Sequence, residues 1–570
     1  MPFIRAKRAK QHTSVSHDSA KHLDPNVSQK RIAIVGSGVS GLTCAHYLGM
    51  QHDVTVFEAS DYIGGHVNTI DVTLQDGKKA KNSQIESSAI DTGFIVFNER
   101  TYPNFFRLLH DLQVPFQATD MSFSVKNTAR RFEYNGHTLN TLLSQRKNVL
   151  SPAFWQFIRN VLQFNKHIKR LRKDYDTARA QGQDTSHFTE QTLGDYLTQQ
   201  KYGELFTDNY LLPMVSAIWS TSLHDVQHFP LVFFAQFFDN HGLLDVVNRP
   251  QWFTIKGGSK QYVNKLIPRF VKAGGTVRVN CPVQSVVRNN DQVTLTIQNK
   301  NDSKGKPETL VFDEVIFACH ADTALKILQD ASTEESEVLG QFRFTKNTAV
   351  LHTDTSVLPK KPLAWASWNY LIEDNTANTV TNDTVTDDAQ TTAKPVLTYH
   401  MNILQRLTKK HNYLVTLNHT VDDNQVIKRI DYSHPVFDQA MTQAQTKWAS
   451  ISGKGLHTHF CGAYWFNGFH EDGVRSGLRV CQALGHKIDI KDEVDPSHLP
   501  TGDSAHTPFL YKDLPIKADK KAKTLSKRQV KTASTNQELL EYIERLQLEA
   551  GDTIKAPAVK RGLFGRRKPH

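Results

Sequence analysis

Cysteine is scarce in this chain, because 570 residues contain only five and no two of them stand in a CxxC pair. An odd count without that spacing indicates a reducing compartment and supplies no set of metal ligands, so no zinc site is expected. Long apolar runs are also missing, and no stretch of about 18 apolar residues could form a membrane-spanning helix. The N-terminal segment is basic but lacks the apolar core of a signal peptide. These absences predict a cytoplasmic protein.

The body of the chain lacks an excess of either charge, and positive charge gathers at the two ends. Residues 1–31 contain seven Lys or Arg and two Asp or Glu, and residues 512–570 contain 15 and seven, which leaves 46 basic and 48 acidic residues in between. A nearly neutral body argues against nucleic acid as a partner. The basic ends are interpreted either as solvated, disordered tails or as segments that dock on anionic lipid headgroups at the inner face of a membrane.

A glycine-rich turn lies between two apolar segments near the start of the chain. The apolar run Arg31–Val35 leads into Gly36, Gly38 and Gly41, and a second apolar strand ends at Glu58. In this spacing the first glycine permits a tight turn, the second lets the backbone approach a pyrophosphate at a helix N-terminus, and the third allows close packing of helix and strand. Glu58 can accept hydrogen bonds from a ribose hydroxyl. The context predicts a dinucleotide-binding fold, and the alternative is an ordinary glycine-rich turn.

A second glycine pair, Gly64-Gly65, follows Glu58 and is succeeded by His66. This segment resembles the second glycine motif of the flavin-dependent amine oxidase superfamily, which includes monoamine oxidases, protoporphyrinogen oxidases and phytoene desaturases. The superfamily usually has Arg after the pair, whereas histidine is mostly neutral at pH 7. Further segments match the superfamily in its order. Gly93 and Phe94 resemble the step beside the isoalloxazine ring, and Val283 matches a valine whose backbone contacts adenine.

The C-terminal part contains a third resemblance to the same superfamily. Phe460–Ala463 followed by His470–Leu478 resembles the C-terminal FAD motif, in which a helix N-terminus faces the flavin. Ala463 stands where many relatives have Asp or Glu. The whole set implies FAD as the cofactor, since an NAD dehydrogenase needs only the first motif. The expected FAD contacts are Gly36, Ser37, Gly38, Val39, Ser40, Gly41, Glu58, Ala59, Gly64, Gly65, His66, Gly93, Phe94, Val283, Gly462, Asp472, Gly473 and Val474.

His470 is the candidate catalytic residue, because amine oxidases often place an aromatic-cage tyrosine at this position of the motif. It would orient the substrate or transfer a proton, and the alternative is that it only caps or hydrogen-bonds the FAD loop. Glu471 and Asp472 are candidates for an acid–base pair, but the helix N-terminus beside them favours a positioning role.

The resemblance implies an α/β fold in which a Rossmann-like FAD-binding domain is interleaved with an α+β substrate domain. We expect residues 31–100, 253–330 and 455–488 in the FAD domain. Residues 101–252, helical in pattern at 154–171 and 193–212, and residues 331–454, with strands at 349–353 and 396–401, would form the substrate domain. Residues 1–30 are expected to be a disordered basic tail, and residues 489–570 a basic extension with a short amphipathic helix after Thr535.

The function expected from these motifs is hydride transfer between a lipophilic substrate and flavin N5. Several stretches, among them Trp365–Tyr370 and Gly468–Gly473, resemble a bacterial group of predicted NAD/FAD-binding oxidoreductases. A similar flavin domain is fused to plant cyclopropane fatty-acid synthases, which implies a fatty-acyl or phospholipid substrate and a lipid-modifying enzyme as a partner. One alternative is oxidation of a small amine. The other is a non-catalytic FAD-binding subunit that supports a lipid-modifying enzyme.

Overall fold

The computed structural model describes residues 28–75, 85–245, 249–289, 291–300, 306–373, 395–453 and 455–491. All of these except 138–140 belong to one compact unit, and the following description concerns that unit. Residues 1–27 of the predicted N-terminal tail and the amphipathic helix after Thr535 lie outside the described residues. Within the described residues, no helix is both long and apolar enough to cross a membrane.

A five-stranded parallel sheet forms the core of the first layer. Its order is β10 (Thr276–Arg278), β2 (Asp53–Phe57), β1 (Arg31–Val35), β14 (Glu314–Phe317) and β20 (Thr458–Phe460). The central strands are buried on both faces, as apolar runs such as Ile32–Ile34 require. Segments far apart in the sequence therefore meet in one sheet, and the carboxyl ends of their strands share one edge.

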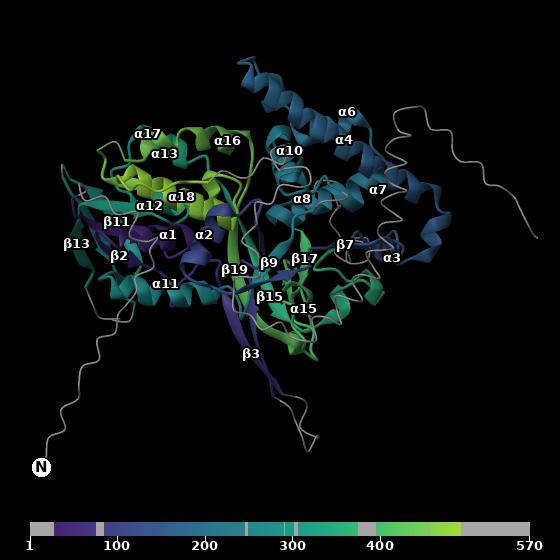
Figure 1. Cartoon of the computed structure of the whole chain (residues 1–570), viewed down its shortest axis with the longest axis horizontal. Coiled ribbons are helices and arrows are strands. Elements are labelled where there is room, and N and C mark those ends of the chain that lie inside the picture. The colour runs from purple at the N-terminus through teal and green to yellow at the C-terminus, as the bar shows by residue number, and fades with distance from the viewer. Residues whose placement is uncertain are drawn as a thin grey trace, which may run out of the picture. The chain divides into compact units, whose positions relative to one another are not determined.

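Three helices pack together beside this sheet. Helix α1 (Val39–Leu48) lies between α11 (Lys260–Lys272) and α18 (His470–Ala483) (Figure 1) and contacts both. An antiparallel meander of β11 (Val283–Arg288), β12 (Val293–Ile297) and β13 (Glu308–Phe312) adds a second, smaller sheet. The Phe57 and Phe312 rings, 5.9 Å apart, join β2 to this meander. The α/β fold class predicted from the sequence is confirmed.

A second, mostly antiparallel sheet has seven strands. Its order is β19 (Val426–Pro435), β15 (Phe344–His352), β18 (Leu414–Leu417), β17 (Val396–His400), β16 (Trp368–Ile372), β7 (Phe123–Asn127) and β8 (Phe132–Asn135). Strand β7 pairs with β16 in parallel, so two segments widely separated in the chain complete one sheet. The expectation that residues 101–252 are helical is therefore wrong for β7 and β8, because pairing with a distant strand overrides a weak local pattern.

Helices of the 101–252 segment cover one end of that sheet (Figure 1). The longer ones are α4 (Pro152–Ala180), α6 (Leu193–Gln200), α8 (Leu212–Trp219) and α10 (Leu231–Asn240), whereas α2 (Pro103–Asp111) packs against α18. Ser151 is the N-cap of α4, and its hydroxyl accepts a hydrogen bond from Phe154 N at 3.3 Å. The predicted helix at 193–212 is interrupted, because Lys201 ends α6 in a left-handed conformation with φ +51°.

Shorter elements complete the description. The small sheets are the hairpin β3 (Thr69–Gln75) with β4 (Ile85–Asp91), and β5 (Phe97–Asn98), β9 (Trp252–Ile255) and β6 (Phe116–Thr119). The shorter helices include α5 (Ser186–Thr189), α7 (Glu204–Phe206), α9 (Leu223–Gln227), α12 (Ala321–Ile327), α13 (Thr333–Leu339), α15 (Met401–Leu404), α16 (Gln439–Thr446) and α17 (Trp448–Ile451).

Candidate functional site

The turn between β1 and α1 is shaped by two structurally required glycines. Gly36 has φ +107°, and a Cβ there would lie 2.7 Å from the carbonyl oxygen of Ala318. A Cβ on Gly41 would lie 2.1 Å from the carbonyl oxygen of Gly36 and 3.2 Å from the Ile34 side chain. These two positions therefore let α1 begin close against the carboxyl edge of the parallel sheet.

Gly38, the middle glycine of the turn, faces open space. It is the N-cap of α1, with an extended backbone and no side-chain cap. A Cβ built on it would meet no atom of the described residues within 4 Å. Gly65 from the second glycine motif lies next to it, because a Cβ on Gly65 would be 3.2 Å from the Gly38 Cα. The N–H groups of an uncapped helix N-terminus attract anions. This bare backbone cradle fits the pyrophosphate of a dinucleotide.

Ser37 and Glu58 tie the two glycine motifs together. Oε2 of Glu58 accepts hydrogen bonds from the Ser37 N–H at 2.9 Å and the Ser37 hydroxyl at 2.6 Å, while Oε1 accepts one from Ser60 N at 2.9 Å. The Ser37 Oγ accepts a hydrogen bond from Gly64 N at 3.2 Å. A carboxylate has about four acceptor positions. Glu58 is thus held in a fixed orientation and retains capacity for a ribose hydroxyl.

The buried carboxylate of Asp91, at the end of β4, joins three segments of the chain. Its Oδ1 accepts hydrogen bonds from the Thr69 hydroxyl at 2.6 Å and from the Ser259 N–H and hydroxyl, both at 2.8 Å. The Gln405 amide donates to Oδ2 at 3.2 Å. Burial raises the pKa of Asp91 to about 6, against the lowering effect of these bonds. Asp91 therefore positions the step that leads to Gly93 and Phe94.

We expect Asp91 to make the protein less stable as the pH rises. Its folded-state pKa of about 6 exceeds the usual 3.8, so the folded protein holds this proton more tightly than the unfolded chain. The resulting stabilisation is complete below the unfolded pKa and is lost as the pH rises through 6, a change of up to about 3 kcal/mol. Denaturant unfolding at pH 4 and pH 7 should show this slope in the wild type and not in Asp91→Asn. Equal slopes in both proteins, with exposed Asp61→Asn as the control, would contradict the assignment.

His66 brings the second glycine motif against strand β19. Its ring stacks on that of Tyr432 with centroids 4.9 Å apart and lies 5.5 Å from the ring of His434. Burial, with smaller effects of His434 and His320, lowers the pKa of His66 to about 3. Its Nε2 is buried and has no hydrogen-bond partner among the described residues. The neutral ring therefore offers a flavin nucleotide a hydrogen-bonding nitrogen in place of a permanent positive charge.

His470, the candidate catalytic residue, is the first residue of α18 and is buried. Its ring stacks on Phe94 with centroids 3.7 Å apart and planes 10° from parallel, and it meets Phe105 edge-on at 4.9 Å. The Nε2 atom lies 3.0 Å from the Tyr262 hydroxyl. Burial lowers the pKa of His470 well below its usual value, so the ring is neutral at pH 7. Packing on three sides gives the imidazole one fixed orientation.

Glu471, the next residue, binds the N-terminus of another helix. Its carboxylate accepts hydrogen bonds from Asn104 N at 3.0 Å, from Asn104 Nδ2 at 2.6 Å and from Phe105 N at 2.8 Å. These N–H groups belong to the first turn of α2, whose N-cap residue Tyr102 provides no side-chain cap. Asp472 accepts a hydrogen bond from Phe469 N at 2.8 Å and so caps α18 itself. Both carboxylates therefore make positioning contacts.

Gly473 lies where α18 crosses α1. A Cβ on Gly473 would be 2.4 Å from the Val39 side chain and 3.1 Å from the Ser40 hydroxyl, and a Cβ on Gly477 would be 2.7 Å from the Ser40 carbonyl oxygen. The sequence predicts Val39, Ser40 and Gly473 as cofactor contacts. The structure places them in a close contact between the two helices that both begin beside the cradle.

The other predicted cofactor residues lie along the same edge or behind it. A Cβ on Gly93 would be 2.3 Å from the His66 carbonyl oxygen, Val474 is fully buried in α18, and the Gly462 N–H donates to Ser476 Oγ at 3.0 Å. Val283 begins β11 and is buried, and the Ala59 carbonyl accepts a hydrogen bond from Lys300 Nζ at 3.0 Å. The structure thus brings the glycine motifs, Glu58, His66 and the start of α18 together.

Two contacts at this site have no signal in the sequence. The Tyr262 hydroxyl beside His470 comes from α11, 208 residues away, and Asn104 is 367 residues from its partner Glu471. The one related signal in the sequence is the apolar face of α11, which predicts that Tyr262 is buried, as the structure shows. Together, an α/β sheet, an uncapped helix N-terminus and a glycine-lined cradle define a protein of the dinucleotide-binding class.

Comparison with known proteins identifies the family. Residues 39–485 match the model of the flavin containing amine oxidoreductase family, so this chain belongs to that family. The protein is an FAD-dependent oxidoreductase, and the expectation of FAD as its cofactor is confirmed.

Individual relatives are distant. An L-amino-acid oxidase of Notechis scutatus scutatus is 26% identical over 153 residues, which is 27% of this chain and 21% of that protein. The chain therefore matches only about a fifth of that curated relative. Cyclohexylamine oxidase from Brevibacterium oxydans IH-35A is similar in structure with a TM-score of 0.51 and 15% identity, over 81% of this chain and 99% of the other. The CLA-producing fatty acid isomerase from P. acnes has a TM-score of 0.52 and 13% identity, over 80% and 98%. At such identities the likeness shows the fold alone.

Proposed function

We propose that this chain oxidises, desaturates or saturates a lipophilic substrate of the fatty-acyl or phospholipid class. FAD, when bound, supplies the two-electron redox chemistry through N5 of its ring. The residues of the chain would bind the substrate, exclude water and hold a reactive C–H bond in place. The observation that carries the proposal is a buried cluster of aromatic side chains that ends beside His470.

The aromatic cluster extends from the helices of the 101–252 segment to the start of α18. The Trp219 and Phe237 rings have centroids 4.5 Å apart, and Phe237 stacks on Phe469 at 4.9 Å. His241 stacks on Phe237 at 3.9 Å, and burial lowers the pKa of His241 to about 4, so it is neutral. Phe469 directly precedes His470. Aromatic and neutral side chains suit an apolar chain better than an ammonium group or a carboxylate.

Oxidation of a small amine is the second candidate, and the family match favours it. The stacked pair of Phe94 and His470 also offers an aromatic surface on which an amine could lie. Since structures of this fold include both a cyclohexylamine oxidase and a fatty acid isomerase, the fold does not choose between the substrates. The experiment that separates them mixes the FAD-loaded protein anaerobically with unsaturated phospholipid, cyclopropane phospholipid and a panel of amines. Loss of visible flavin absorbance with lipid alone supports the proposal, and loss with amines alone overturns it.

His470→Ala should leave FAD bound and slow flavin reduction by the substrate by about 100-fold, the scale of a lost positioning or proton-transfer group. The physical reason is that Phe94, Phe105 and Tyr262 hold this neutral ring in a single orientation. Stopped-flow reduction under anaerobic conditions measures the rate, and FAD titration measures retention. Exposed His187→Ala on α5 is the matched control. Unchanged reduction kinetics in His470→Ala would remove the residue from the reaction, and a parallel loss of FAD would reduce it to a packing role.

A further inference from the structure

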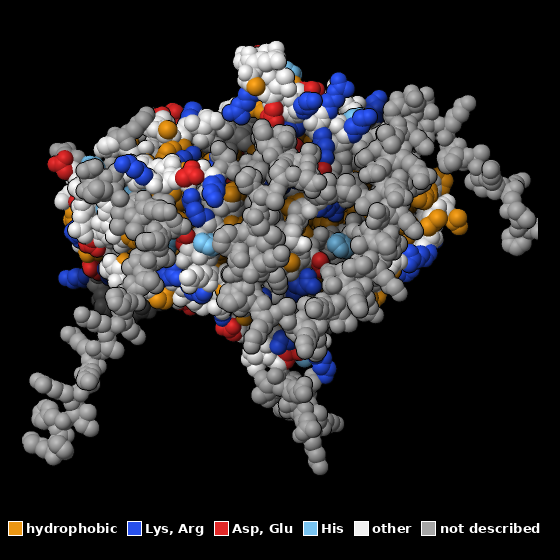
Figure 2. Space-filling view, viewed as in Figure 1, with side chains coloured by type: hydrophobic (Ala, Val, Ile, Leu, Met, Phe, Trp, Pro, Cys, Tyr) orange, Lys and Arg blue, Asp and Glu red, His pale blue; other side chains and the backbone are white. Residues whose placement is uncertain are grey.

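Large apolar side chains are exposed together where the chain enters α4. Leu150 is 87% exposed, Val149 42% and Trp155 40%. The first two end the helical turn η2 (Arg146–Leu150), and the Trp155 Nε1–H donates to the Val149 carbonyl at 2.9 Å, which holds the three side chains at one place. Figure 2 shows hydrophobic side chains at the edge of the molecule where Figure 1 places the start of α4. We call Val149, Leu150 and Trp155 the α4 entry surface.

Positive charge predominates in the sequence around the α4 entry surface. Residues 134–173 contain eight Lys or Arg and no Asp or Glu. Three of these eight residues, Arg146, Lys147 and Arg159, are exposed and stand near the apolar residues in the sequence. Lys361 adds a further positive charge. It directly precedes the turn η5 (Pro362–Ala364), and its Nζ donates a hydrogen bond to the Ser144 carbonyl at 3.0 Å. The exposed Leu363 belongs to the same turn. The exposed acidic residue Glu204, which follows Gly203 beside Gln156 and Asn160, is paired with Arg130 at 2.8 Å.

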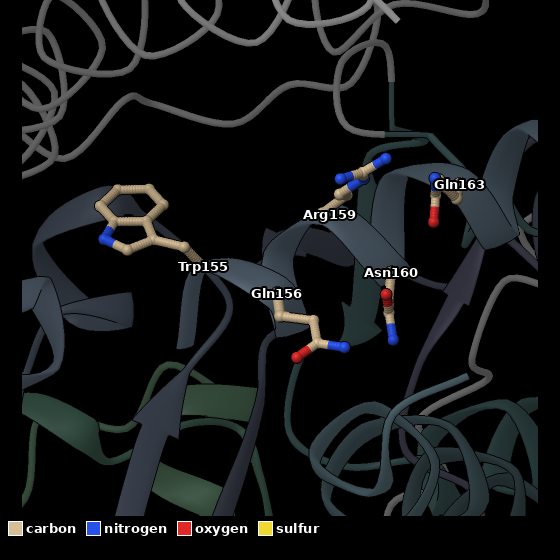
Figure 3. Close-up of a pocket in the computed structure, with 5 residues that line it drawn as sticks. All are labelled: Trp155, Gln156, Arg159, Asn160 and Gln163. Carbon is tan, nitrogen blue, oxygen red and sulfur yellow. The ribbon is translucent and has the colours of Figure 1, made fainter. Parts of the chain in front are cut away.

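A pocket of about 490 Å³ lies beside Trp155 along α4. Figure 3 shows its lining, which consists of Trp155, Gln156, Arg159, Asn160 and Gln163. One guanidinium and three amides can donate hydrogen bonds to an anionic oxygen. The pocket therefore has the chemistry to receive a phosphodiester, while Leu150 and Val149 next to it offer an apolar contact.

We propose that the α4 entry surface and its basic surroundings bind the interface of an anionic phospholipid bilayer. Exposed Trp and Leu beside Lys and Arg are typical of side chains that enter the headgroup and acyl boundary, and basic groups near such a surface are attracted to anionic lipid. Charge argues against the other occupants. The chain's own C-terminal segment 512–570 is basic, with 15 Lys or Arg against seven Asp or Glu, and a second copy would bring two basic surfaces together. This surface is independent of the lipid substrate proposed above.

The test uses the full-length, FAD-loaded protein and sedimentation with vesicles of phosphatidylcholine alone or mixed with phosphatidylglycerol. We expect binding to the mixed vesicles only, and weaker binding at high salt. Leu150→Glu should weaken binding at least tenfold. The double variant Lys147→Ala/Arg159→Ala should weaken it by about fivefold for each charge removed. Val271→Glu, at a 51% exposed valine on α11, and Lys326→Ala, at an exposed lysine of α12, are matched controls and should bind as the wild type does.

A second measurement locates the contact. Brominated lipid in the mixed vesicles should quench part of the tryptophan fluorescence of the wild type, and Trp155→Phe should lose that part. An unchanged flavin spectrum and melting temperature show that each variant is folded. The proposal is overturned if wild-type protein ignores anionic vesicles, or if Leu150→Glu binds them normally, which would assign binding to the tails. It is also overturned if Leu150→Glu only converts a dimer to a monomer in gel filtration, or if the surface binds RNA in place of vesicles. This test measures vesicle binding and not flavin reduction. The proposal of membrane binding can therefore be contradicted independently of the proposal of a lipid substrate.

Discussion

Gly38→Val should abolish FAD binding and leave the fold intact. The backbone at Gly38 is extended, with φ −65° and ψ 176°, which valine adopts readily. Within the described residues, a Cβ at this position meets no atom within 4 Å, so the added side chain would project into the cradle at the N-terminus of α1. The FAD pyrophosphate would have to give up that position. We expect a loss of affinity of 100-fold or more, about 2.7 kcal/mol.

The measurements are FAD titration of the apo-protein and its thermal unfolding. Gly136→Val is the matched control, because Gly136 follows β8 and has no positive φ. Among the described residues, the atom nearest to a Cβ there is the Phe123 carbonyl oxygen at 3.9 Å. Gly41→Ala should give the opposite result to Gly38→Val. Its Cβ would lie 2.1 Å from the Gly36 carbonyl oxygen, so the fold itself should lose about 1–3 kcal/mol or more. Normal FAD affinity in Gly38→Val would show that the cofactor does not occupy this cradle.

Glu471→Ala should cost about 3–4 kcal/mol of the free energy of unfolding. The carboxylate is 3% exposed and satisfies two backbone N–H groups and one amide at the N-terminus of α2. Removing it leaves buried donors unpaired, at about 1–3 kcal/mol for each, and removes an anion from a helix N-terminus. The first turn of α18, which carries His470, would also lose its link to α2, so FAD affinity should fall with stability.

Urea unfolding of the apo-protein measures the loss as a lower midpoint. Glu471→Gln should retain part of the stability, because one oxygen remains as an acceptor while the new NH₂ group faces a donor. Glu334→Ala, at an exposed acidic residue in the first turn of α13, should change the free energy by no more than about 0.5 kcal/mol. An unchanged midpoint in Glu471→Ala would show that water replaces the carboxylate at α2.

Prediction from the sequence succeeded where the structural requirement is local. The spacing of Gly36 and Gly41 predicts a tight strand–helix turn, and the structure shows the close contacts that exclude a Cβ at both positions. The amphipathic pattern at 154–171 predicts a helix, and α4 contains it. These features depend on a few neighbouring residues, whose backbone preferences and apolar spacing can be read directly.

Prediction was weaker where distant segments meet. Strand β7 lies in a segment that the sequence predicts to be helical. The prediction fails there because β7 pairs with β16, some 245 residues later in the chain. Glu471 could be assigned only to a general positioning role, since its partner Asn104 is 367 residues away. Long-range pairing of this kind leaves no periodicity in either segment.

The sequence by itself predicted a glycine-lined turn and an acidic strand end of the kind that binds a dinucleotide, because these motifs act through local backbone geometry. Only the tertiary structure decided that Asp91 is a buried tie between three segments, that His66 and His470 are neutral, and that Glu471 holds α2 to α18. The physical reason is that burial and hydrogen-bond partners set the charge and role of a titratable group, and both are properties of the folded chain.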